Sequence, residues 1–167
     1  GGNIIYVDAM KLTAVGQVFN EVTALTSASL IGKFVATERE SRTFLNAAGD
    51  PEYSVTLKGV DGSYTIEGIS KFGLNADGDV IYVDAMKLTA VGQAFNEATA
   101  ITSAALTGKF VATQRESRTF LSVDGDPAYS VTISNDQKMT GVSTFNVVDG
   151  EVKFVDAHDM IKKDTVF

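Results

Sequence analysis

The chain contains no cysteine, only one histidine and only two prolines among its 167 residues. Without cysteine, the sequence excludes disulfides, thiolate-bound zinc, iron–sulfur clusters and cysteine nucleophiles. No apolar run is long enough for a membrane-spanning helix, and we therefore expect no membrane span. The first residues also lack the basic-then-apolar pattern of a secretory signal.

Positive charge is in deficit. The chain has 14 lysines and arginines against 21 aspartates and glutamates, which gives a net charge of -7. Because an acidic protein repels the phosphates of nucleic acid on average, binding to DNA or RNA is disfavoured. A hydrophobic content of 44% with 21% charged residues is ordinary for a folded protein.

What the chain does contain is an internal duplication. Residues 3–57 and 79–133 align at a spacing of 76 positions, and 42 of the 55 aligned residues are identical. A partial third copy follows, because residues 154–157 (FVDA) resemble residues 82–85 (YVDA). Repeat proteins bury a shared core by stacking their units. We therefore divide the chain into unit A (1–79), unit B (80–155) and a partial third unit or C-terminal tail (156–167).

Each unit is predicted to begin with a short strand that leads into a helix. Residues 4–7 form an apolar run typical of a strand, and Asp8 could accept hydrogen bonds from the free N–H groups of a helix start. Apolar residues then recur at helical spacing from residue 10 to about residue 27. Gly16 and Gly92 oppose this helix, since an interior glycine costs about 1 kcal/mol relative to alanine.

The rest of each unit is predicted to be antiparallel sheet, because alternating apolar residues are separated by turn-forming ones. In unit A we expect strands at 30–37, 42–45, 53–57 and 64–74, with the charged residues 38–41 as a turn. The expected fold class is α+β. Two tandem strand-helix-four-strand repeats would form antiparallel sheets, sandwich- or barrel-like, each with one packed amphipathic helix.

The two copies of the predicted helix differ along one stripe, at positions three or four residues apart, where two valines of unit A are replaced by the smaller alanine in unit B. We interpret this stripe as a contact with the other unit or with a neighbouring subunit, and neutral drift is the alternative. The residues are Val18, Val22 and Leu25 in unit A and Ala94, Ala98 and Ile101 in unit B.

The first predicted strand, formed by Ile4, Ile5, Tyr6 and Val7, has no partner upstream in the sequence. An apolar strand without a neighbour leaves an exposed sheet edge unless something covers it. Head-to-tail pairing of such edges gives rings or filaments. The sequence therefore predicts self-association through this strand.

A pair of arginines recurs in each unit within the motif Arg-Glu-Ser-Arg. Paired arginines can bind the carboxylate or phosphate of a ligand through two hydrogen bonds each. We favour internal ion pairing with Glu40 and Glu116 at a turn over a ligand. The arginines are Arg39 and Arg42 in unit A and Arg115 and Arg118 in unit B.

Other polar residues give weaker signals. His158 is the only histidine and is interpreted as a solvated residue at a helix start. Oxygen ligands for Ca²⁺ could come from Asp50, Asp124 and Asp126, or from Asn75, Asp77 and Asp79. Neither set has the EF-hand spacing, so turn formation is favoured. We find no catalytic motif and expect no cofactor, metal or enzymatic activity.

These observations favour a structural, self-assembling repeat protein whose partner is itself, such as a subunit of a virion, tube, filament or surface assembly. It would use sheet-edge and helix-face contacts, and an extracellular or virion-associated setting is slightly favoured. One alternative is a small-ligand-binding protein or enzyme with an apolar pocket between sheet and helix. Another is an adaptor whose acidic surface docks a basic partner.

Overall fold

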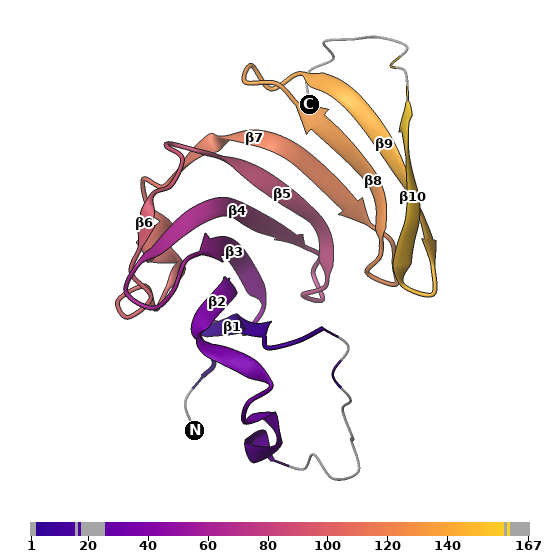
Figure 1. Ribbon diagram of the computed structural model, residues 1–167. Coiled ribbons are helices and arrows are strands. Elements are labelled where there is room, and N and C mark those ends of the chain that lie inside the picture. The colour runs from indigo at the N-terminus through magenta and orange to yellow at the C-terminus, as the bar shows by residue number, and fades with distance from the viewer. Residues whose placement is uncertain (1–2, 16, 18–25, 159, 161–167) are drawn as a thin grey trace.

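The structure is a computed structural model, and it describes residues 3–15, 17, 26–158 and 160. Within these residues the chain forms one antiparallel sheet of ten strands (Figure 1). The strands are β1 (Tyr6–Leu12), β2 (Phe34–Leu45), β3 (Pro51–Lys58), β4 (Tyr64–Leu74), β5 (Val80–Leu88), β6 (Ala94–Phe95), β7 (Phe110–Leu121), β8 (Pro127–Ile133), β9 (Met139–Val148) and β10 (Glu151–His158). Two short 3-10 helices, η1 (Ser27–Leu30) and η2 (Ser103–Leu106), complete the secondary structure.

Apart from β6, strands that follow one another in the sequence are neighbours in the sheet. Its strands lie in the order β1-β2-β3-β4-β5-β7-β8-β9-β10, and the short β6 pairs with β4. Tyr6 lies opposite Phe44 in unit A as Tyr82 lies opposite Phe120 in unit B. Since neighbouring strands alternate in direction and nine of them follow this path, β1 and β10 run in the same direction at opposite edges of an open, curved sheet (Figure 1).

Tight turns join most neighbouring strands, and their residues explain why. In the turn between β2 and β3, the Asn46 side-chain oxygen accepts hydrogen bonds from the backbone N–H groups of Ala48 and Asp50. Gly49 in this turn has a φ of 97°, a conformation that glycine adopts without strain. The same pattern returns at residues 75–79, and with serine in place of asparagine at residues 122–126.

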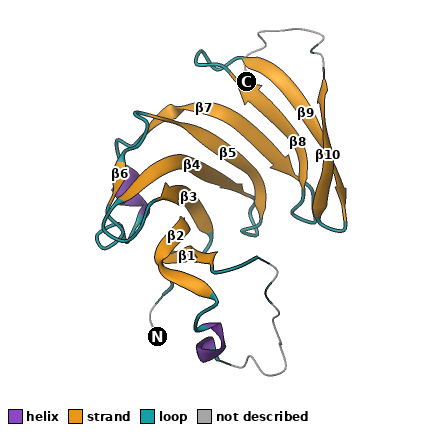
Figure 2. Ribbon diagram, in the orientation of Figure 1, coloured by secondary structure: helices purple, strands orange, loops and turns teal. Residues whose placement is uncertain are grey.

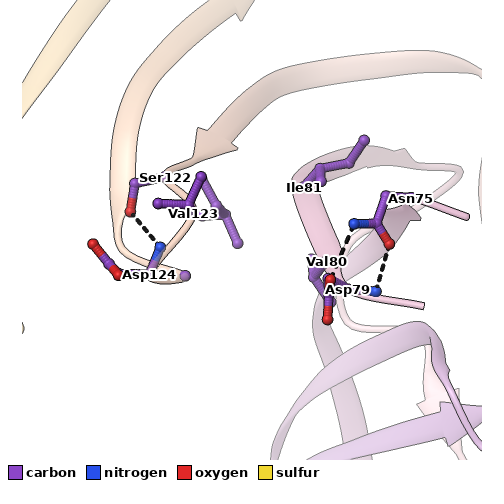
Figure 3. Close-up of a pocket in the computed structure, with 9 residues that line it drawn as sticks. Asn75, Asp79, Val80, Ile81, Ser122, Val123 and Asp124 are labelled. Atoms are coloured by element: carbon purple, nitrogen blue, oxygen red, sulfur yellow. Dashed lines mark hydrogen bonds between the residues drawn. The ribbon is translucent and has the colours of Figure 1, made fainter. Parts of the chain in front are cut away.

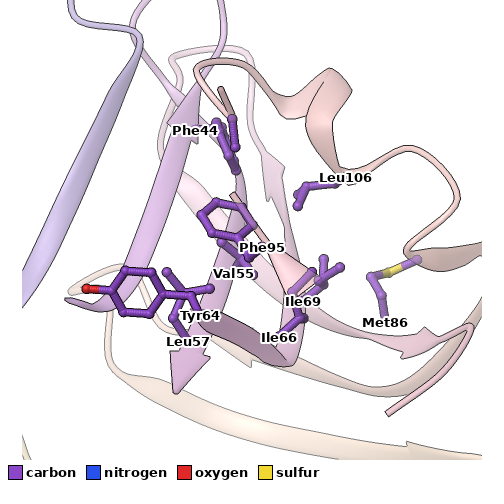
Figure 4. Packing of buried hydrophobic residues seen from close by; sticks show 10 residues of the cluster. Phe44, Val55, Leu57, Tyr64, Ile66, Ile69, Met86, Phe95 and Leu106 are labelled. Carbon is purple, nitrogen blue, oxygen red and sulfur yellow. The ribbon is translucent and has the colours of Figure 1, made fainter. Parts of the chain in front are cut away.

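The long connection at residues 89–109 of unit B folds over the sheet of unit A (Figure 2). β6 pairs with the start of β4, where Phe95 lies opposite Tyr64. The main hydrophobic core therefore contains residues from both units (Figure 4). Its buried members are Phe44, Val55, Leu57, Tyr64, Ile66, Ile69, Met86, Phe95, Ala100 and Leu106.

The corresponding connection in unit A is not covered by another unit among the described residues. Leu30 ends η1 as Leu106 ends η2, yet Leu30 is 42% exposed and Leu106 is 1% exposed. Val15 and Ile31, in the described part of the same connection, are 96% and 80% exposed. The same local structure is therefore buried in one unit and open in the other.

The expected α+β fold class is wrong, because the described residues contain no helix longer than the four-residue η1 and η2. Residues 10–12 of the predicted helix belong to β1, and residues 86–88 belong to β5. Gly92 has a φ of 68°, which a right-handed helix cannot contain. The helical spacing of apolar residues instead comes from a connection that inserts Phe95, Ala100 and Leu106 into the core of unit A.

Three further predictions are corrected. The sheet is a single open one and is neither a sandwich nor a closed barrel. Asp8 lies within β1 and does not cap a helix. Residues 38–41 do not form a turn, because β2 runs unbroken from Phe34 to Leu45 and merges the two predicted strands. The charges of this segment suggested a turn, but they lie in the strand because arginines pair with an aspartate on β1.

No helix within the described residues is long and apolar enough to cross a membrane.

Candidate functional site

Each unit contains a carboxylate held between two arginines of the neighbouring strand. In unit A, Asp8 on β1 lies opposite Arg42 on β2. Arg42 donates from Nε to Asp8 Oδ1 at 2.6 Å and from Nη2 to Asp8 Oδ2 at 2.7 Å, which is bidentate pairing. Arg39 donates from Nε to Asp8 Oδ2 at 2.8 Å. We call Asp8, Arg39 and Arg42 the unit A ion cluster.

Unit B builds the same ion cluster from Asp84, Arg115 and Arg118. Arg118 donates from Nε and Nη2 to the two oxygens of Asp84 at 2.6 and 2.8 Å. Arg115 donates from Nε to Asp84 Oδ2 at 2.6 Å. The Asp84 side chain is 1% exposed, whereas the Asp8 side chain is 16% exposed. The difference arises because β5 has β4 on its other side and β1 has no described neighbour there.

The arginines lower the pKa of both aspartates. Burial alone would raise the pKa of Asp84, but the hydrogen bonds from Arg118 and Arg115 outweigh it and lower the pKa below its ordinary value. The same balance, with hydrogen bonds from Arg42 and Arg39, lowers the pKa of Asp8. Both carboxylates are therefore ionised at neutral pH, so each cluster carries two positive charges and one negative.

An aromatic ring lies against one arginine of each cluster. The Cζ atom of Arg42 lies 3.9 Å from the centroid of the Tyr6 ring, and that of Arg118 lies 3.7 Å from the centroid of Tyr82. Stacking of this kind adds a cation–π attraction and keeps water from the guanidinium plane. The aromatic-x-aspartate pattern of β1 and β5 thus supplies both the carboxylate and the ring.

The unit A cluster also holds the two units together. Arg42 donates from Nη1 to the backbone oxygens of Glu97 and Ala100, both at 2.8 Å, in the connection of unit B. Its side chain is only 2% exposed. Since its Nε, Nη1 and Nη2 groups all donate to atoms of this chain, Arg42 serves the fold and not a ligand.

Other contacts fasten the same connection to unit A. Ser103 donates from Oγ to Glu52 Oε2 at 2.7 Å, and Gly62 N donates to Glu97 Oε1 at 2.8 Å. The rings of Tyr53 on β3 and Phe110 on β7 lie 5.5 Å apart. The interface between units is therefore polar at its rim and apolar at its centre.

In unit A, Arg39 has two further partners, Tyr64 and Asp61, that its counterpart in unit B lacks. The Tyr64 hydroxyl accepts from the Arg39 backbone N–H and donates to the Thr37 carbonyl, both at 2.8 Å. Arg39 also pairs through Nη1 with Asp61. Unit B has no tyrosine in its shorter β8–β9 connection or at the start of β9 (residues 134–140), and its Arg115 side chain is 30% exposed against 19% for Arg39. Arg39 thus has more partners than Arg115 and is less exposed to solvent.

The arginines were singled out from the sequence, but their predicted partners were wrong. Glu40 and Glu116 form none of the salt bridges within the described residues, and the aspartates on the adjacent strands take that role. Sequence reasoning missed Asp8 and Asp84 because it assigned them to helix caps. One signal could have found them. In both copies the aspartate lies 34 residues before the second arginine of Arg-Glu-Ser-Arg, and both residues lie in segments that form neighbouring strands.

The predicted helix-face contact is not formed as expected. Val18, Val22 and Leu25 lie outside the described residues. In unit B, Ala94 lies in β6, whereas Ala98 and Ile101 lie in the connection that follows, and all three are exposed. They are not on a helix, and the core contact of this segment is made by other residues, among them Phe95 and Leu106.

The predicted edge residues lie at the free edge of β1 or just before it. Ile4, Ile5 and Val7 are 67%, 43% and 54% exposed, and Tyr6 is half-buried against the Arg42 guanidinium. At the other edge, every residue of β10 is exposed, including Phe154 at 54% and Val155 at 51%. Both sheet edges therefore present apolar side chains, and no other described strand pairs with their backbone.

A hollow of about 560 Å³ lies between two turns, those at residues 75–79 and 122–126 (Figure 3). Its polar side chains are engaged within their own turns, since Asn75 donates to Asp79 and Asp124 N donates to Ser122. No group of three or more acidic or histidine side chains within the described residues could hold a metal ion. His158 lies on β10 and not at a helix start, and it hydrogen-bonds Thr144.

Together these features define a repeat protein built from four-stranded antiparallel units in one continuous sheet. Comparisons with models of known protein families, with curated protein sequences and with solved structures found no match.

Proposed function

We propose that this chain is a structural, self-assembling repeat protein, a building unit of a larger assembly such as a filament, tube or surface layer. The observation that carries this proposal is the way in which its units join. The connection of unit B completes the core of unit A, and within the part of the chain that the structure describes no strand pairs with the outer edge of β1 or of β10. Such an arrangement extends by adding units at its edges.

The open edges supply the association surface. A sheet edge offers unpaired N–H and C=O groups, and proteins that remain monomeric usually protect it with charges, proline or a covering segment. Here the edges carry Ile4, Val7, Phe154 and Val155, each more than half exposed. Pairing of such strands between molecules would form backbone hydrogen bonds and remove these side chains from water.

The ion clusters support the structural role over ligand binding. A ligand-binding arginine needs donors that face a cleft, whereas Arg42 is buried and donates to Asp8, Glu97 and Ala100. The clusters instead fix the register of each first strand against the second, and the unit A cluster also ties unit A to unit B. Polar groups with this role are expected in a structural protein, where they determine which strands pair with each other.

The test is the size of the purified protein across a wide concentration range, measured by light scattering and examined in negative-stain images. We expect rings or filaments that grow with concentration. The variant Val7→Lys places a charge at the β1 edge and should reduce assembly. The matched control is Val123→Lys, at a fully exposed turn residue away from both edges, which should leave assembly unchanged.

Two outcomes would contradict the proposal. A wild-type chain that stays monomeric at every concentration lacks self-association altogether. Equal loss of assembly in both lysine variants would mean that added charge acts through general repulsion and not through the sheet edge.

A further inference from the structure

We infer that copies of this chain join head to tail by strand replacement, in which β1 of a second copy takes the place of β10 alongside β9. This inference rests on the proposed function, since it specifies the contact through which the chain self-assembles. It follows from a comparison of the three strands of the same type, β1, β5 and β10.

β5 shows what such a strand looks like when its surroundings are complete. It pairs with β4 on one side and β7 on the other. Asp84 is 1% and Met86 is 2% exposed. The connection that follows β5 places Leu106, 1% exposed, in the core of the preceding unit.

β1 has the same sequence as β5 from Tyr6 to Leu12 but lacks a neighbour on one side within the described residues. Its Met10 is only half-buried, and its Asp8 side chain is 16% exposed. Leu30, the counterpart of Leu106, is 42% exposed. Among the described residues, β1 therefore has no strand of the β4 type at its outer edge, and no sheet of a neighbouring unit lies under its connection.

β9 is the strand of the β4 type that could fill this place. Residues 141–145 (GVSTF) repeat the pattern of residues 68–72 (GISKF). β9 is already paired with β10, in the same register as β4 with β5: Val155 lies opposite Phe145, as Val83 lies opposite Phe72. Yet β10 is exposed along its whole length, and no salt bridge joins its Asp156 to another described residue.

Replacement has a driving force that edge-to-edge contact lacks. Exchanging β10 for β1 of a second copy keeps the number of strand pairings, because one ladder with β9 is lost and an equivalent one is formed. The exchange places Met10 where His158 stands and brings Leu30 over an apolar sheet, which adds apolar burial. Joining the edge of β10 to the next β1, with the same face of the sheet continuing across the joint, would instead create a parallel pair in an otherwise antiparallel sheet, because the two strands run in the same direction.

The expected register follows from the pairing of β4 with β5. Val7 of the second copy should lie opposite Phe145, Asp8 opposite Thr144, Ala9 opposite Ser143 and Met10 opposite Val142. The second copy would keep its own β1–β2 pairing, so Asp8 would stay between Arg39 and Arg42. The joined sheet would then be antiparallel throughout.

The absence of cysteine makes this register directly testable by disulfide trapping. In the double variant Ala9→Cys, Ser143→Cys, strand replacement brings the two cysteines opposite each other in different molecules, at a spacing that a disulfide can bridge. We expect a ladder of covalent oligomers on a non-reducing gel after mild oxidation. The matched control Ser70→Cys, Ala85→Cys places cysteines at the equivalent pair within one chain, and it should give a cross-linked monomer.

A second variant tests whether β10 must leave. Ser143 lies opposite Ala157 of β10 in the same chain. The double variant Ser143→Cys, Ala157→Cys therefore locks β10 onto β9 when it is oxidised. We expect loss of assembly in the oxidised form and recovery when a reductant is added, whereas the wild-type chain should not respond to the reductant.

The outcomes separate this inference from the proposed function. Assembly that persists in the locked variant, or an absence of interchain links in Ala9→Cys, Ser143→Cys, would overturn strand replacement while self-assembly stands. An intrachain link between residues 9 and 143 would show a sheet that closes on itself and would also overturn it. A wild-type chain that never assembles would contradict both proposals.

Discussion

Arg42 donates a hydrogen bond to the carbonyl oxygen of Ala100, a residue that lies 58 positions later in the chain. One end of the Arg42 guanidinium is held by Asp8 of its own unit, and the other reaches the connection of unit B. Unit A is thus completed by residues that belong to unit B. The stability of unit A should depend on this connection as much as on its own strands.

Arg42→Ala should be among the most damaging single substitutions in the chain. It leaves the Asp8 carboxylate and two backbone carbonyls without their buried donor, and breaking a buried pair in this way costs about 3–5 kcal/mol. Urea unfolding followed by circular dichroism would measure the loss. Arg118→Ala is the matched comparison and should cost less, because the Arg118 side chain is 17% exposed. Equal costs would argue against the special role of Arg42.

Leu106→Ala and Leu30→Ala remove the same side chain from two nearly identical local structures. At residue 106 the change leaves a cavity in the shared core and should cost about 2–5 kcal/mol. At residue 30 the side chain is 42% exposed, and a change of about 0.5 kcal/mol or less is expected in the monomer. Thermal unfolding at low protein concentration provides the comparison. A similar loss at both positions would mean that the first connection is also packed.

The ion clusters should make the protein sensitive to acid. The folded-state pKa of Asp84 is lowered, so the stability it contributes is complete above the ordinary aspartate pKa of about 3.9 and is lost as the pH falls through the folded value. Asp84→Asn should therefore be less stable than the wild type at pH 7 and should lose less stability on acidification. Melting temperatures measured between pH 7 and pH 2 would test this. A parallel pair of curves would contradict it.

Gly73→Ala should disturb the ion cluster of unit B from the neighbouring strand. A Cβ atom at residue 73 would meet the ring of Tyr82 at 2.0 Å, and Tyr82 is the ring against which Arg118 lies. Because the ring must move, we expect a loss of about 1–3 kcal/mol in unfolding free energy. Gly68→Ala, where the nearest atom is 3.9 Å away, is the control and should change stability little. Tolerance at residue 73 would show that Tyr82 is free to shift.

Much of the sheet could be predicted from the sequence because its cause is local. Alternating residues and turns such as residues 46–50 fix the β2–β3 and β4–β5 hairpins, and the repeat guarantees that they recur. The prediction of a helix was wrong because the apolar spacing of this segment reflects its contact with another unit and not a local helix. Phe95, Ala100 and Leu106 face the sheet of another unit, and a single window of sequence does not distinguish such a connection from an amphipathic helix.

The arginines of the ion clusters were predicted from the sequence, but their aspartate partners were not. The repetition of Arg39 and Arg42 as Arg115 and Arg118 drew attention to the arginines, but nearby glutamates were the obvious partners in one dimension. The actual partner, Asp8, lies 34 residues before Arg42 and comes next to it only through strand pairing. Pairing between strands is set by the whole sheet, so it could not be derived from the spacing of charges alone.

The staggered core also determines how this chain can be divided. A cut between β4 and β5 follows the boundary of the sequence repeat, but it would separate Phe44, Val55 and Ile66 from Phe95 and Leu106, which cover them. The first half would then expose its interior, while the second half would carry a covering segment with nothing beneath it. An excised fragment that contains unit A should therefore end after Lys109, so that it keeps the connection at residues 89–109 that covers its core.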